Sequence, residues 1–349
     1  MSSSPEQKTE EDWWIYRGTG KPHSAIENLP EAPAWRTFDT PPADQLMALP
    51  ATEVTAATAR RLGRDRQASA YQADTKEIHL VNLALHLRRP LLITGKPGVG
   101  KSTLAYAVAH ELGLGPVLRW SITSRSTLHD GLYAYDAVGR LHDAGIERSA
   151  TADEKPDIGR YLRLGALGTA LLPWKQPRVL LIDEIDKCDV DLPNDLLNVF
   201  EEGEFEIPEL ARLGPDKEQH VMTADQLGTA KITGGWVRCA QFPFVVLTSN
   251  AEREFPAAFL RRCVRLEVQP PDEARLAAMV AAHLGGNQDT ASLRTELIAE
   301  FLRRQREEDA ALANDQLLNA LLMAERGLWG HQPGRDMIHD VLLRPLSDG

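Results

Sequence analysis

Residues 95–102 read Gly-Lys-Pro-Gly-Val-Gly-Lys-Ser, a glycine-rich stretch that ends in a lysine and a hydroxyl residue. This is a complete G-x-x-x-x-G-K-[ST] phosphate-binding pattern, the Walker A motif. Glycines let backbone N–H groups approach phosphate oxygens, Lys101 would reach the β- and γ-phosphates, and the Ser102 hydroxyl would ligate Mg²⁺. The sequence therefore predicts that the chain binds a nucleoside triphosphate.

The flanking segments support this interpretation. An apolar run at residues 90–94 precedes the loop, and a helical pattern at residues 103–110 follows it. A strand that leads through a glycine-rich turn into a helix surrounds one anion with backbone N–H groups and a positive helix end. The alternative is a glycine-rich turn that holds no phosphate. The residues expected to contact nucleotide are Gly95, Pro97, Gly98, Val99, Gly100, Lys101, Ser102, Thr103 and Asp183.

A second motif lies at residues 178–187, where four consecutive apolar residues end in Asp183 and Glu184. Such a run is typical of a strand buried on both faces of a parallel sheet, and parallel sheets place their ligands at the carboxyl ends of the strands. We interpret it as a Walker B strand. Asp183 would hold Mg²⁺ through water, and Glu184 would polarise the water that attacks the γ-phosphate. Taken alone, two acids that follow a core strand are also common before a helix N-terminus.

Two further polar sites follow along the chain. Residues 242–250 form another buried-strand pattern that ends in Asn250, whose amide could hydrogen-bond the attacking water or the γ-phosphate. Asparagine is also a common turn residue at a strand end. Shortly afterwards, Arg261 and Arg262 end a short helical stretch, where a solvated helix terminus is the alternative explanation.

The order of these motifs resembles that of the AAA+ ATPases, and their detail is similar to the MoxR family. Three stretches carry the finer resemblance: residues 158–173, residues 185–187 and residues 191–206. The resemblance covers about residues 70–330. It implies that Asn250 is the sensor 1 residue and that Arg261 or Arg262 is an arginine finger.

An arginine finger acts on nucleotide held by a neighbouring subunit, so the resemblance implies a closed ring, which we expect to be a homo-hexamer. It also implies ATP and Mg²⁺ as cofactors and a chaperone-like role on a protein client, for example a protein with a von Willebrand factor A domain. One departure is visible. Residues 312–321, where many AAA+ proteins carry a sensor 2 arginine, contain no arginine.

The composition is normal for a soluble globular protein. The chain has 349 residues, of which 43% are hydrophobic and 26% charged, and a formal net charge of -11. A net negative charge argues against a broad nucleic-acid or membrane-binding surface. The three cysteines form no zinc or disulfide pattern, residues 1–12 are polar and acidic, and no apolar run approaches a membrane span. We therefore expect a cytoplasmic protein.

The elements that must position these motifs predict an α/β fold: a doubly wound parallel sheet of the P-loop NTPase type with a C-terminal all-α lid. We divide the chain into a proline- and aromatic-rich segment at 1–50, an ATPase core at 51–269 and a lid at 270–349. The first segment is expected to pack Trp13, Trp14 and Trp35 on the core, or else to serve as a docking tag.

Within the core, residues 74–87 should form a mostly buried helix, and residues 272–284, 291–306 and 315–328 should form the lid helices. Two insertions are expected. Residues 128–144 are predicted to form a hairpin, in which Tyr133 and Tyr135 pack across strands or grip a polypeptide. Residues 203–239 are predicted to form a two-stranded excursion around the loop at 214–219, with a plain surface loop as the alternative.

Three other functions remain open at this stage. A nucleic-acid-stimulated motor would require basic or aromatic pore loops. A GTP-specific ring is compatible with the sequence, because no base-reading motif is visible. A nucleotide-gated scaffold, for example in a bacterial defence complex, would bind ATP without turning it over, and Glu184 and the paired arginines argue against this.

Overall fold

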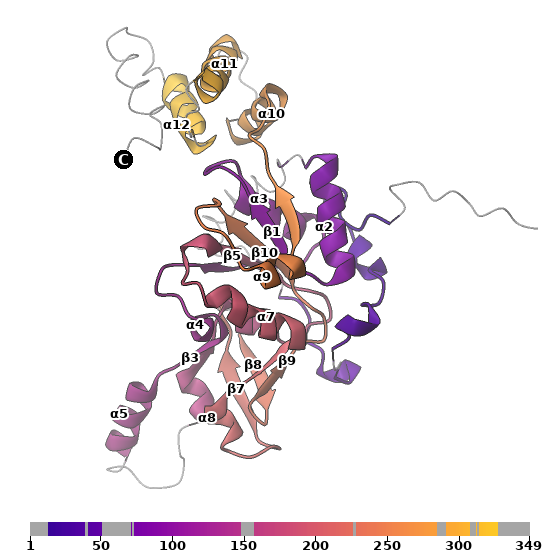
Figure 1. Cartoon of the computed structure of the whole chain (residues 1–349). Helices are drawn as coiled ribbons and strands as arrows, with labels where there is room; N and C mark the ends of the chain where they lie inside the picture. The colour runs from indigo at the N-terminus through magenta and orange to yellow at the C-terminus, as the bar shows by residue number, and fades with distance from the viewer. Residues whose placement is uncertain are drawn as a thin grey trace, which may run out of the picture.

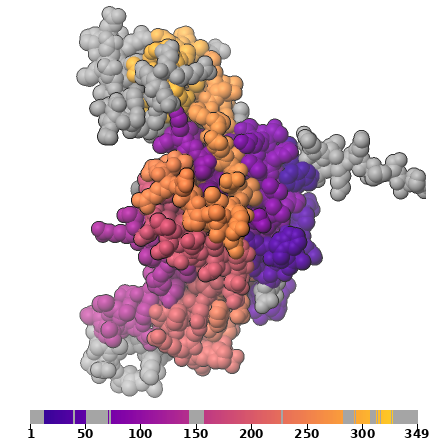
Figure 2. Space-filling model, viewed as in Figure 1, coloured from indigo at the N-terminus to yellow at the C-terminus, as the bar shows by residue number. Residues whose placement is uncertain are grey.

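The computed structural model describes residues 13–38, 41–50, 71, 73–147, 157–225, 228–284, 291–307, 312 and 314–326. Figure 1 shows three parts of this chain in succession: helices α10–α12 at one end, a central sheet flanked by helices, and a second sheet at the other end. The space-filling view in Figure 2 shows the same order, with the N-terminal segment in indigo along the side of the central part.

In the described part of the chain, the central sheet has five parallel strands in the order β11-β1-β10-β5-β2. These are β1 (Leu91–Thr94), β2 (Leu118–Ser121), β5 (Val179–Asp183), β10 (Phe244–Ser249) and β11 (Val264–Glu267). Every residue of β5 and β10 is buried, as expected for inner strands with both faces covered. The predicted parallel sheet is confirmed, and the strand before Asn250 lies beside the strand that ends at Asp183.

Helices flank this sheet (Figure 1). They include α2 (Thr75–Leu87), α3 (Lys101–Glu111), α7 (Leu192–Glu202) and α9 (Ala257–Arg262). Helix α2 starts at Asp74, whose side chain accepts a hydrogen bond from the Glu77 N–H while the Glu77 side chain accepts from the Asp74 N–H. This capping box satisfies backbone donors that a helix start leaves open. The predicted helix at 74–87 is confirmed.

The second sheet has six strands among the described residues, in the order β3-β4-β7-β8-β9-β6. They are β3 (Tyr133–Tyr135), β4 (Leu162–Leu164), β6 (Glu204–Glu206), β7 (Glu218–Met222), β8 (Thr229–Thr233) and β9 (Trp236–Arg238). Four short helices accompany them: α4 (Leu128–Leu132), α5 (Ala137–Glu147), α6 (Ala166–Ala170) and α8 (Pro208–Ala211). One buried hydrophobic cluster contains residues of both sheets, so the second sheet shares the core of the first.

The hairpin predicted for residues 128–144 is wrong. A capping box between Thr127 and Asp130 starts α4, and the Asp136 carboxylate accepts the Gly139 N–H at the start of α5. The short strand between these helices pairs with β4, and Tyr133 lies opposite Leu164. The side-chain hydrogen bonds at the starts of α4 and α5 therefore outweigh the weak strand alternation of this segment.

The two-stranded excursion predicted for residues 203–239 is also too simple. This segment supplies four strands, in which β6 pairs with β9 and β7 pairs with β8. Tyr133 packs against this region: its hydroxyl donates to Glu209 at 2.9 Å, and its ring stacks on Phe205. Tyr133 is therefore a buried packing residue.

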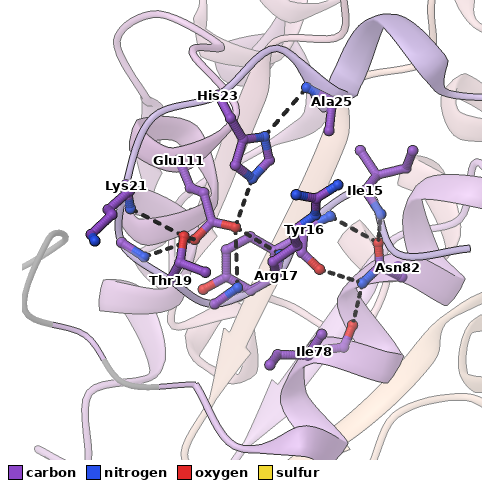
Figure 3. A network of polar contacts seen from close by, with 12 residues as sticks. Ile15, Tyr16, Arg17, Thr19, Lys21, His23, Ala25, Ile78, Asn82 and Glu111 are labelled. Carbon is purple, nitrogen blue, oxygen red and sulfur yellow. Dashed lines mark hydrogen bonds and ion pairs between the residues drawn. The ribbon is translucent and has the colours of Figure 1, made fainter. Parts of the chain in front are cut away.

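The N-terminal segment is fastened to the core by two polar side chains, shown in Figure 3. The Asn82 side chain of α2 accepts the backbone N–H groups of Ile15 and Tyr16 and donates to the Tyr16 carbonyl. Glu111, the last residue of α3, accepts the N–H groups of residues 17, 18 and 20. Trp13 and Trp14 make edge contacts with histidines of α2 as the packing interpretation expects, whereas Trp35 is 77% exposed and does not follow it.

The C-terminal helices are α10 (Glu273–Leu284), α11 (Ala291–Glu307) and α12 (Asn314–Glu325). They share a separate apolar core that includes Leu276, Phe301 and Leu317. The helical prediction for this region is confirmed for these ranges. None of the described helices combines the length and the apolar character needed to cross a lipid bilayer.

Candidate nucleotide-binding site

The glycine-rich loop connects β1 directly to α3, as the motif predicts. Three of its glycines adopt positive φ angles: 155° at Gly95, 75° at Gly98 and 96° at Gly100. At Gly95 a side chain is also excluded by space, because a Cβ atom there would lie 2.6 Å from the Val268 carbonyl oxygen. The loop therefore needs glycine for both conformation and close approach.

Lys101 begins α3, and its ammonium group is buried among acceptors. Its Nζ donates to the carbonyls of Gly95 at 2.8 Å and Lys96 at 2.9 Å, and to Asn250 Oδ1 at 2.7 Å. Burial lowers the pKa of Lys101 below its ordinary value, and the nearby carboxylates, led by Asp186, only partly offset this. The phosphate-loop lysine and the predicted sensor asparagine are thus in direct contact.

The other loop residues have supporting positions. Val99 is buried in the apolar cluster beneath the loop, whereas Pro97 is half-buried. The Thr103 N–H donates to the Gly100 carbonyl at 3.0 Å, within the first turn of α3. These contacts support the conformation of the loop.

Asp183 ends β5 and is almost fully buried, with four donors around its carboxylate. Its Oδ1 accepts the hydroxyls of Ser102 and Thr248, each at 2.7 Å. Its Oδ2 accepts Nη2 of Arg119 at 2.6 Å and Nε of the same residue at 3.2 Å. A carboxylate offers about four lone-pair positions, so these donors satisfy it.

Burial by itself would raise the pKa of Asp183. The hydrogen bonds from Thr248, Ser102 and Arg119 outweigh burial, so the pKa lies below its ordinary value of 3.8. Asp183 is therefore an anion over the whole neutral range. Sequence reasoning missed Arg119 and Thr248, although Thr248 stands out as the first polar residue after four apolar residues of its strand.

Glu184 follows Asp183 in the left-handed backbone region, with a φ of 63° that is unusual for a residue other than glycine. Its N–H donates to the Thr248 hydroxyl at 3.0 Å, which fixes this conformation. Its carboxylate is half-exposed and pairs with Lys187 at 2.9 Å. The Thr248 hydroxyl therefore contacts both predicted acids: it donates to the Asp183 carboxylate and accepts the backbone N–H of Glu184.

Asn250 follows β10 and is held by a third acid that sequence reasoning left without a role. The buried Asp186 carboxylate accepts the Asn250 N–H at 2.8 Å and the Glu252 N–H at 3.2 Å. Between these two residues, Ala251 has a φ of 61°. A strained backbone at this position is maintained because the aspartate binds both of its neighbours.

Arg261 and Arg262 both lie in the last turn of α9, and the structure separates them. Arg262 donates from Nε to Glu201 at 2.7 Å and from Nη1 to the Ala258 carbonyl. The Arg261 side chain is exposed and has no hydrogen-bond or ion-pair partner in the described part of the chain. Within one chain, among the described residues, neither arginine contacts Lys101, Asp183, Glu184 or Asn250.

Ser102 and Asp183 fit a Mg²⁺ ion by the chemistry of their donors, because hydroxyl and carboxylate oxygens are the hard ligands that it prefers. Their contact at 2.7 Å shows that both side chains point to one place. No cluster of three or more His, Cys, Asp or Glu residues that could hold a metal occurs among the described residues. A cation at this place would take its remaining ligands from phosphate and water, and it would neutralise charge on the β- and γ-phosphates.

The lid segment without an arginine also reaches this site. The Asn314 N–H, at the start of α12, donates to the Gly98 carbonyl at 3.3 Å, and its Oδ1 is buried without a partner among the described residues. A polar side chain of the lid therefore lies against the phosphate loop.

Residues 90–263 match the family model of the AAA domain, dynein-related subfamily. None of the curated proteins compared with the chain matches it. Among solved structures, a similar one is the RuvB Holliday junction branch migration motor of Thermotoga maritima, with 14% sequence identity and a TM-score of 0.34. That comparison covers 72% of this chain and 61% of the other, so the chain spans about three fifths of that protein's length. Residues 90–263 of this chain are therefore similar to the AAA domain of the dynein-related subfamily.

Proposed function

We propose that the chain hydrolyses ATP as a MoxR-type AAA+ enzyme and that it acts on a protein partner in a homo-oligomeric ring. One observation carries the proposal: three distant segments of the sequence bring Lys101, the adjacent pair Asp183 and Glu184, and Asn250 together at the carboxyl edge of the central sheet. Lys101 contacts Asn250, and Thr248 links Asp183 to Glu184. A phosphate-binding loop, a metal-binding carboxylate and a second acid are the parts that nucleotide hydrolysis requires.

In the proposed mechanism, Lys101 leaves its carbonyl partners and binds the β- and γ-phosphates of ATP. Ser102 and Asp183 would hold Mg²⁺, which would neutralise phosphate charge, and Glu184, freed from Lys187, would orient and deprotonate the attacking water. Asn250, released from Lys101 at its Oδ1 atom, then donates a hydrogen bond to the γ-phosphate from its side-chain NH₂ group, which donates to Glu252 at 3.4 Å in this structure. The Lys101–Asn250 contact therefore supports a coupling between phosphate binding and the position of the sensor.

Arg261 is the proposed arginine finger. AAA+ ATPases typically assemble in rings, and a finger must reach the nucleotide of a neighbouring subunit across a heterologous contact. The exposed guanidinium of Arg261 is available for this, whereas Arg262 is held by Glu201 within its own chain. We infer a hexamer, as in the family that the chain resembles.

The proposed client is a protein, with a von Willebrand factor A domain protein as the first candidate, in the cytoplasm. The resemblance at residues 158–173 and 191–206 and the net charge of -11 support a protein client over nucleic acid. A GTP-specific ring, a nucleic-acid-stimulated motor and a nucleotide-gated scaffold are the alternatives that the following experiment separates.

The test is ATP turnover by the wild type and by Glu184→Gln across concentrations that span assembly, with mass photometry on the same samples. We expect turnover to rise with ring formation and to fall at least ~10²-fold in Glu184→Gln, which should retain ATP. Glu218→Gln is a matched control, because the Glu218 side chain is 52% exposed, against 45% for Glu184, and pairs with Lys231 as Glu184 pairs with Lys187. Nucleotide binding without turnover in any assembly state would favour the scaffold, and parallel assays with GTP and duplex DNA test the other two alternatives.

The trans action of Arg261 can be tested by mixing two inactive variants. Arg261→Ala subunits keep an intact Glu184, and Glu184→Gln subunits keep an intact Arg261. Mixed rings should therefore recover part of the turnover that each variant lacks alone. An Arg261→Ala variant with wild-type turnover, or no recovery in rings shown to be mixed, would contradict the assignment.

A further inference from the structure

Arg119 is a cation at the Walker B carboxylate that none of the motifs in the sequence predicts. It lies on β2, the edge strand beside β5, where Arg119 is level with Leu181 and Ser121 with Asp183. Leu118 and Trp120 point into the core and Arg119 to the other face. The arginine is therefore placed next to the end of β5 by strand alternation.

The two oxygens of Asp183 have different partners. Among the described residues, the Oδ1 atom accepts the hydroxyls of Ser102 and Thr248, whereas the Oδ2 atom accepts only from the guanidinium of Arg119. With all four donors present, the carboxylate has no free lone pair for a metal ion or for a metal-bound water. The guanidinium of Arg119 thus occupies the carboxylate oxygen that a Mg²⁺ ion or its bound water would need to reach.

We propose that Arg119 competes with Mg²⁺ for the Asp183 carboxylate and so sets how strongly ATP binding depends on Mg²⁺. The inference rests on the proposed function of the site as an ATP site. The guanidinium of Arg119 balances the charge of Asp183, and it would release Oδ2 to a Mg²⁺ ion that binds together with ATP.

The exposure of Arg119 supports an exchangeable contact. Its side chain is 42% exposed, while that of Asp183 is 9% exposed, so the guanidinium can move into water and the carboxylate stays in place. Such a half-exposed pair is worth little to the fold and costs little to open. Two positive groups at one carboxylate also repel each other, so Arg119 weakens Mg²⁺ binding even when it moves only partly.

The same charge has the opposite effect when Mg²⁺ is absent. ATP without Mg²⁺ brings phosphate charge close to Asp183, and a nearby guanidinium reduces the repulsion. Arg119 therefore weakens the Mg²⁺-bound state and supports the Mg²⁺-free state. The relevant ratio is the dissociation constant of ATP without Mg²⁺ divided by the constant with Mg²⁺. Both effects make this ratio smaller in the wild type than in a variant that lacks the Arg119 charge.

The experiment measures the dissociation constant of ATP by titration calorimetry in EDTA and in saturating Mg²⁺, on the full chain. For Arg119→Met we expect the ratio of the two constants, without and with Mg²⁺, to rise about fivefold to tenfold over the wild type. Arg119→Lys should lie between them, because it keeps the charge and loses the two-nitrogen contact. Melting curves in EDTA without nucleotide verify that each variant is folded.

Arg238→Met is the matched control, because Arg238 is 49% exposed and pairs with Glu204 on the second sheet. Its ratio should equal that of the wild type. An unchanged or smaller ratio in folded Arg119→Met and Arg119→Lys overturns the proposal, as does an equal change in Arg238→Met. If the wild type binds no ATP in either condition, the ATP site itself is wrong and this inference is overturned with it.

Discussion

The two ends of β5 carry the same pair of side-chain types in very different surroundings. At the amino end, Arg178 donates to Asp225 at 3.0 Å, and the two side chains are 0% and 4% exposed. At the carboxyl end, Arg119 donates to Asp183 at 2.6 Å, and the arginine is 42% exposed. The comparison shows that burial, more than the distance between the charged atoms, decides whether an arginine–aspartate pair can open.

The amino-end pair is held from several sides. Arg178 also donates to the Pro116 carbonyl at 3.0 Å and lies over the Trp174 ring at 4.8 Å, while the Thr223 hydroxyl donates to Asp225. Burial lowers the pKa of Arg178 more than Asp225 raises it, although the group remains charged. Because Asp225 follows β7, this pair joins the second sheet to the strand that carries Asp183.

The largest expected effect is the loss of the amino-end pair. Arg178→Met should lower the free energy of unfolding by about 3–5 kcal/mol, because it removes the cation that balances a buried carboxylate. The measurement is urea unfolding followed by circular dichroism. Asp225→Asn in the Arg178→Met background should recover part of the loss, since it removes the buried charge. A loss below about 1 kcal/mol in Arg178→Met would mean that the two ends of β5 do not differ as the comparison requires.

A smaller effect is expected from the charge of Asp183. Asp183→Asn should lower the unfolding free energy in EDTA at pH 7 by about 1–2 kcal/mol, because charge-assisted hydrogen bonds are lost. The pKa of Asp183 is lowered in the folded protein, so this stabilisation is fully present above pH ~4 and is lost as the pH falls through the folded pKa.

The difference between wild type and Asp183→Asn should therefore stay constant from pH 7 to about pH 4.5 and shrink only below that. Asp225→Asn is a useful second variant, because it changes a carboxylate at the opposite end of the same strand. A difference that begins to shrink above pH 5 would show that burial outweighs the hydrogen bonds to Asp183, contrary to the geometry.

The sequence could predict those features that depend on neighbouring residues in the chain. The central sheet, the phosphate loop and the lid helices follow from contiguous patterns: apolar runs of strand length, a fixed glycine spacing and helical periodicity. Asp183, Glu184 and Asn250 were recognisable because each stands directly after such a run. The positions of these elements are confirmed, and the catalytic roles remain proposals.

The second sheet and the partners of Asp183 depend on contacts between distant segments. Strand β3 is three residues long and pairs with β4, which lies some thirty residues further along, so its own alternation says little. Arg119 occupies an exposed position of a short edge strand, where an arginine is unremarkable until the register with β5 is known. Asp186 is one more acid after a Walker B strand, and only the fold shows that it binds the Asn250 backbone.

The smallest expected effect sharpens the comparison most. Arg119→Met should lower the unfolding free energy without nucleotide by about 1 kcal/mol or less, because the pair is half-exposed and Ser102 and Thr248 still donate to Asp183. Raising the salt concentration from about 0.1 M to about 0.5 M should shrink this difference, since salt screens exposed charges. The loss caused by Arg178→Met should hardly change over the same range, because water and ions do not reach that pair. Equal salt dependence of the two variants would show that both ends of β5 are equally open, and the exchangeable contact proposed for Arg119 would then have no physical basis in its exposure.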